Sequence, residues 1–72
     1  MNAEDVARGL LLYVQDSVAL RKWASDVLTG SDGLDLEAHP DGDLLLNALW
    51  DASFGGRITD EAVAAARRVA QN

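Results

Sequence analysis

Apolar residues recur along the chain at the three- and four-residue spacing that places side chains on one side of an α-helix. The pattern predicts four helical segments, near residues 3–14, 17–29, 40–54 and 60–70. Alternation of apolar and polar residues, which is typical of a strand, is limited to the short stretch LDLEA before the third segment. We therefore predict an all-α fold, a small bundle of four short helices around a single core, formed as one domain by residues 1–72.

Residues that favour helix termini mark most of the segment boundaries. Side chains suited to N-caps precede three segments: Asn2, Asp16 and Thr59. Pro40 fits the first turn of the third helix, and the Gly55–Gly56 pair should stop that helix. Gly30 is placed to end the second helix in the left-handed conformation. The connection around Gln15 is so short that two alternatives stay open, two separate helices or one kinked helix.

The third segment carries the pattern that bears most on function. One side of it is a broad apolar arc of Leu45, Leu46, Ala48, Leu49, Ala52 and Ser53. On the other side, Asp43, Asn47 and Asp51 are spaced by four and form one exposed row, with Trp50 at the border. An aromatic residue flanked by carboxylates is typical of a site for a basic partner. Leu12 is a second apolar residue that points away from the stripe of its own helix.

The net charge of −6 is concentrated in the middle of the chain. Residues 23–56 hold seven acidic residues and no basic residue. The negative electrostatic field of these residues disfavours direct contact with nucleic acid and attracts a basic protein. No apolar run reaches the roughly 18 residues of a membrane span, and Glu4 and Asp5 stand where a signal peptide carries basic residues. We therefore expect a soluble, cytoplasmic protein with no membrane contact.

The composition also limits the chemistry. The chain has no cysteine and one histidine, His39, which excludes disulfides and a zinc site made of several imidazoles. No nucleophile with a positioned partner group accompanies His39, so we expect no catalysis and no cofactor. An EF-hand register that starts at Asp32 would place Leu34 and Leu36 at ligand positions. One that starts at Asp35 would place Pro40 at the glycine position and Leu46 at the last ligand position, so neither register fits the motif. A looser oxygen site is the alternative, built from Asp32, Asp35, Glu37 and Asp41.

The triplet Asp16-Ser17-Val18 resembles the motif of acyl and peptidyl carrier domains, over these three residues only. Such domains are small, acidic and four-helical, and a serine at the start of their second helix carries a phosphopantetheine arm. The resemblance implies that Ser17 is the attachment residue. The chain departs from carriers in two respects, since it lacks the long loop before the serine and has Arg21 and Lys22 where carriers are usually acidic.

Together these patterns predict a small, non-catalytic protein of a bacterial-type cytoplasm that binds a basic protein partner. Regulatory, neutralising and mimic proteins all fit this description. The site is expected to comprise the residues outside the apolar stripes: Trp50, Asp43, Asn47, Asp51 and Leu12. The alternative hypothesis is an enzyme-associated module, either carrier-like or binding a divalent metal. A homodimer stays open, because so small a core gains stability from association.

Overall fold

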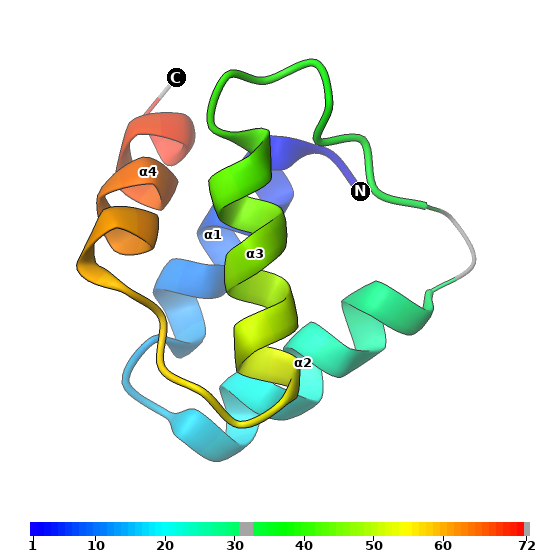
Figure 1. Cartoon of the computed structure of the whole chain (residues 1–72), viewed down its shortest axis with the longest axis vertical. Helices are drawn as coiled ribbons and strands as arrows, with labels where there is room; N and C mark the ends of the chain where they lie inside the picture. The colour runs from blue at the N-terminus through cyan, green and yellow to red at the C-terminus, as the bar shows by residue number, and fades with distance from the viewer. Residues whose placement is uncertain (31–32, 72) are drawn as a thin grey trace.

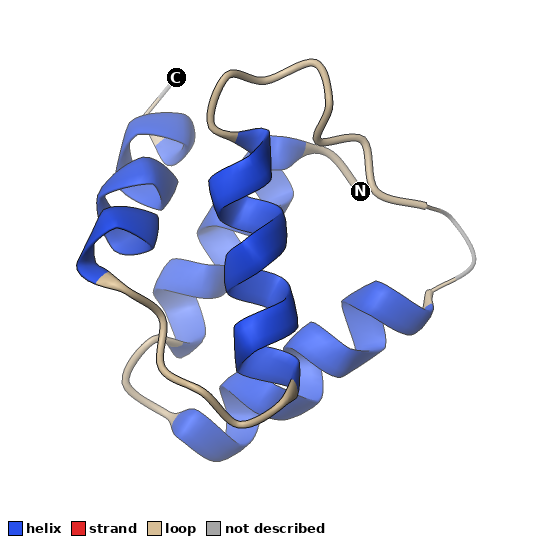
Figure 2. Cartoon of the chain, viewed as in Figure 1, coloured by secondary structure: helices blue, strands red, loops and turns tan. Residues whose placement is uncertain are grey.

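The computed structural model describes residues 1–30 and 33–71, which form four α-helices joined by loops (Figures 1 and 2). The helices are α1 (Ala3–Tyr13), α2 (Ser17–Thr29), α3 (Gly42–Ser53) and α4 (Asp60–Ala70). Among residues 1–30 and 33–71, the extended stretch around Asp35 makes a single bridge, to Asn2. The predicted all-α class is confirmed. Within the described residues, each helix is too short or too polar to cross a membrane.

All three predicted N-caps are confirmed. In each, the side-chain oxygen accepts a hydrogen bond from the amide three residues later, as follows: Asn2 from Asp5 at 2.9 Å, Asp16 from Ala19 at 3.1 Å, and Thr59 from Ala62 at 3.1 Å. The first two helices are separate rather than one kinked helix. The chain turns between them, where the Asp16 amide donates to the Tyr13 carbonyl at 2.9 Å.

The predicted left-handed conformation of Gly30 is wrong. Gly30 has φ −63° and ψ 146°, which is extended backbone. Its amide donates to the Val27 carbonyl at 3.3 Å, and the Thr29 hydroxyl donates to the Ser25 carbonyl at 2.9 Å. Because these bonds satisfy carbonyls at the end of α2, the helix ends without a left-handed residue.

The predicted start of the third helix at Pro40 is also wrong, since α3 begins at Gly42. Pro40 lies in the preceding turn, where His39 Nδ1 accepts a hydrogen bond from the Asp41 amide at 3.0 Å. Gly42 is buried against the Leu36 carbonyl, and a Cβ at this position would overlap that oxygen. The helix therefore begins at a glycine because only a residue without a side chain fits beneath the loop.

The loop between α2 and α3 is held down by two leucines. Leu36 is buried in the core and Leu34 is half-buried against it. Between them, the Asp35 amide donates to the Met1 carbonyl at 2.9 Å. The described part of this loop thus lies along the N-terminus, as Figure 1 shows.

The core lies between the four helices and is built from leucine, valine and alanine. The largest fully buried side chains are Val6, Leu10, Leu45 and Leu49. α1 packs mainly against α4, and α2 against α3. The protein is flat, with extents of 28 × 27 × 16 Å, and α3 lies on one broad face with α1 behind it (Figure 1). Val14 is exposed because it follows the end of α1. Ala65 of α4 is fully buried.

Trp23 of α2 packs at the edge of this core. Its indole is half-buried and lies over Gly9 of α1, where a Cβ would overlap ring atoms. The Trp23 and Tyr13 ring centroids are 5.8 Å apart. The absence of a side chain at Gly9 therefore allows α1 and α2 to approach with an indole between them.

Candidate docking surface

The outer side of α3 carries the row of polar residues that the sequence predicted. Asp43, Asn47 and Asp51 lie on this side, with both carboxylates exposed, whereas Leu45 and Leu49 on the opposite side are fully buried. The row follows from helix geometry, because side chains four residues apart stack along one side.

Trp50 and Phe54 form an exposed aromatic pair beside this row. Their ring centroids are 6.2 Å apart with an interplanar angle of 21°, and the two side chains are 48% and 81% exposed. Sequence reasoning missed Phe54, which it treated only as the end of the helix. The available signal was its spacing of four residues from Trp50. The Trp50 carbonyl accepts hydrogen bonds from the Phe54 amide at 3.3 Å and from the Ser53 hydroxyl at 2.8 Å, which closes the last turn of α3.

A groove between α2 and α3 runs beside the aromatic pair. Its lining residues come from both helices: Val18, Arg21, Lys22, Ser25, Asp26 and Ser53. Val18 is 80% exposed and adds an apolar side chain to this groove. The groove places the basic Arg21 and Lys22 next to the C-terminal end of α3.

The structure adds positive charge beside the acidic middle of the chain. The first 22 residues have no net charge in the sequence, but folding brings two of their basic side chains beside α3. The reason is the packing of α2 against α3, which joins the neutral and acidic parts of the chain on one surface.

Helix geometry orders these groups across the surface. At about 100° per residue, Trp50 lies about 60° around α3 from Ser53, Phe54 about 100° and Asp51 about 160°. Ser53 borders the groove with α2. The order across the helix is thus the basic residues of α2, the aromatic pair, and then Asp51. Asp43 lies about 80° from Ser53, at the angle of the aromatic pair but two turns nearer the start of α3. We define the α3 face as the outer residues of this helix and its C-cap: Asp43, Asn47, Trp50, Asp51 and Phe54.

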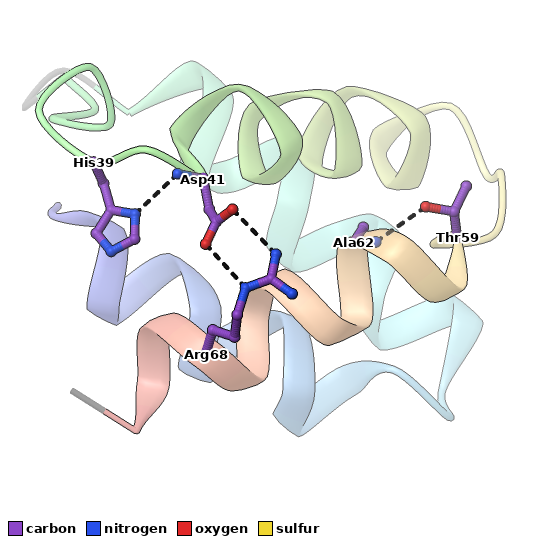
Figure 3. A network of polar contacts seen from close by, with 5 residues as sticks. All are labelled: His39, Asp41, Thr59, Ala62 and Arg68. Carbon is purple, nitrogen blue, oxygen red and sulfur yellow. Dashed lines mark hydrogen bonds and ion pairs between the residues drawn. The ribbon is translucent and has the colours of Figure 1, made fainter.

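Asp41, counted in the acidic stretch, is paired with Arg68 of α4 (Figure 3). The carboxylate accepts hydrogen bonds from Arg68 Nε at 3.3 Å and from a terminal guanidinium nitrogen at 3.1 Å. The hydrogen bond from Arg68 is the main cause that lowers the pKa of Asp41 below its usual 3.8. The same bond raises the pKa of Arg68. The pair joins residues 27 positions apart and fastens the start of α3 to the last turn of α4.

The loose metal site considered from the sequence is not assembled in the described part of the chain. Asp32 lies outside the described residues. Within them, no three His, Asp or Glu side chains are grouped as metal ligands. Asp41 instead pairs with Arg68, and His39 Nδ1 accepts a hydrogen bond from the Asp41 amide. His39 therefore has a structural role at the start of α3.

Two other residues singled out in the sequence lie outside the α3 face. Leu12 of α1 is 73% exposed and follows the buried Leu10 by two residues, so it points away from the core that α3 covers. Ser17 is exposed as the first residue of α2. The connection before Ser17 is the short turn of residues 14–16, which differs from the long loop of carrier domains.

Comparisons of this chain with protein-family models, with curated proteins and with solved structures found no significant match.

Proposed function

We propose that this chain is a non-catalytic protein, of a regulatory or neutralising kind, that binds a basic protein partner through the α3 face. The observation that carries the proposal is the exposed pair Trp50–Phe54 beside the carboxylates of Asp43 and Asp51. Tryptophan is enriched among the residues that dominate binding energy at protein interfaces. Two neighbouring aromatic side chains at the surface leave apolar area in water that a partner can cover.

The charge beside the pair supports a basic partner. Asp51 lies on the side of α3 away from Arg21 and Lys22, and Asp43 lies two turns nearer the start of the helix. A partner's basic side chains would therefore meet carboxylates that are apart from these two basic residues. Asn47 between the two acids can donate and accept hydrogen bonds without adding charge. In this arrangement the aromatic pair supplies the desolvated anchor, and the carboxylates supply the attraction that guides association.

Selection from a displayed peptide library tests the proposal and needs no identified partner. The bait is the folded chain, and peptides that also bind the Trp50→Ala/Phe54→Ala variant are removed. The variant should fold, because Phe54 is largely exposed and Trp50 is about half exposed in the free protein, and neither belongs to the buried core. Circular dichroism checks this point. We expect the retained peptides to be rich in lysine and arginine. Neutral or acidic peptides, or a failure of the depletion step to leave any specific binder, would contradict the proposal.

The kinetics of a selected peptide separate the roles of the two residue classes. Trp50→Ala should mainly raise the dissociation rate of the peptide, and the binding free energy should weaken by about 2 kcal/mol or more. Asp43→Asn with Asp51→Asn should mainly slow association, and that effect should fade as added salt shortens the screening length below about 10 Å. Leu12→Ala is the matched control, because it removes an exposed leucine outside the α3 face. Binding that survives the Trp50 and aspartate changes would show that the peptide docks elsewhere.

A further inference from the structure

The α3 face is bordered by opposite charges on its two sides. Arg21 and Lys22 of α2 line the groove on one side of the aromatic pair, while Asp51 lies on the far side of the helix. Asp26 lines the same groove, so that side has two positive charges against one negative. In the described part of the chain, neither Arg21 nor Lys22 belongs to an ion pair.

A surface with this order of charges is complementary to a copy of itself. A two-fold rotation about an axis through the aromatic pair places the acidic row of one copy over the basic residues of the other. The second such contact forms at the same time, because an interface between identical copies uses the same patch twice. The two Trp50–Phe54 pairs then meet at the centre of the interface.

The size and composition of this side of the molecule suit such an interface. The α3 face lies on a broad side of 28 × 27 Å, which accommodates the roughly 800 Å² that each partner contributes to a standard interface. It holds the exposed Trp50 and Phe54, and the neighbouring groove adds the exposed Val18 together with the charged residues Arg21, Lys22 and Asp26. An apolar centre with a polar rim is the usual composition of a protein interface.

We propose that the α3 face pairs with a second copy of this chain in a two-fold symmetric dimer. The acidic row, Asp43 and Asp51, contacts Arg21 and Lys22 of the other copy, and the aromatic pairs are buried between them. This inference goes beyond the binding of a basic partner and does not depend on it. Such a dimer would cover Trp50 and Phe54 in the free protein, so that partner binding and self-association would compete for one surface.

Sedimentation analysis of charge-reversal variants over a range of concentrations tests the pairing. One variant carries Arg21→Glu and Lys22→Glu, and the other carries Asp43→Lys and Asp51→Lys. Each alone should weaken the dimer by about tenfold or more, because it places like charges opposite each other. An equimolar mixture should restore association, since the aspartates of one chain then keep their basic partners and the new lysines face the new glutamates. Arg67→Glu on α4 controls for the change in net charge and should leave the dimer intact.

Three outcomes would overturn the dimer. These are a wild-type chain that stays monomeric up to about 1 mM, dimers that both double variants leave unchanged, and a mixture that fails to associate. The result can be told apart from failure of the partner proposal. Arg21→Glu with Lys22→Glu should abolish self-association yet leave a selected basic peptide bound as tightly as before, or more tightly.

Discussion

Replacement of Gly9 by alanine separates two physical effects of opposite sign. Glycine inside a helix is about 1 kcal/mol less favourable than alanine, so helix propensity alone predicts that Gly9→Ala stabilises the protein. In the structure, however, the new Cβ would overlap ring atoms of Trp23. The indole must move, and overpacking of this kind costs about 1–3 kcal/mol. We therefore expect Gly9→Ala to lower the free energy of unfolding by up to about 2 kcal/mol, once the gain in propensity is subtracted.

Urea unfolding followed by far-ultraviolet circular dichroism measures this effect in two backgrounds. In a Trp23→Ala background the ring is absent, so Gly9→Ala should raise the free energy of unfolding by about 1 kcal/mol. The change of sign corresponds to a coupling energy of about 1–3 kcal/mol between the two positions. Displacement of the indole from Tyr13, whose ring centroid is 5.8 Å away, should also alter the near-ultraviolet spectrum. Equal stabilisation in both backgrounds would refute the placement of Trp23 over Gly9.

Two further predictions concern the core and the ion pair. Leu49→Ala should lower the free energy of unfolding by about 2–5 kcal/mol, because Leu49 is fully buried. The exposed Leu12→Ala should change it by less than about 0.5 kcal/mol, and similar urea midpoints for the two variants would contradict the position of α3. Asp41→Asn should lower the melting temperature above pH 3.8. In that range the Asp41 carboxylate is ionised, and its hydrogen bond with Arg68, which lowers its pKa in the folded state, stabilises the protein. Wild type and variant should converge as the pH falls through that lowered pKa, and a gap that persists in acid would show that the ion pair is not its source.

Sequence patterns were most reliable where the physics is local. Asn2, Asp16 and Thr59 could be identified as caps because a capping side chain bonds an amide only three residues away. The buried and exposed sides of α3 followed from periodicity for the same reason. The conformation of Gly30 was mispredicted because the Thr29 hydroxyl bonds a carbonyl at the end of α2. The start of α3 was misplaced at Pro40 because the Leu36 carbonyl leaves room only for a glycine, Gly42, where the helix begins.

The sequence by itself determined the four helices, three of their caps and the outer acidic row of α3, since each depends on residues within a turn or two of one another. Only the tertiary structure decided what lies beside that row. It paired Asp41 with Arg68, 27 positions away, and placed Arg21 and Lys22 along the groove next to Ser53. Helical periodicity says which side of a helix is buried but not which helix covers it. The neighbours of the α3 face are therefore set by how α2 and α4 pack around the shared core.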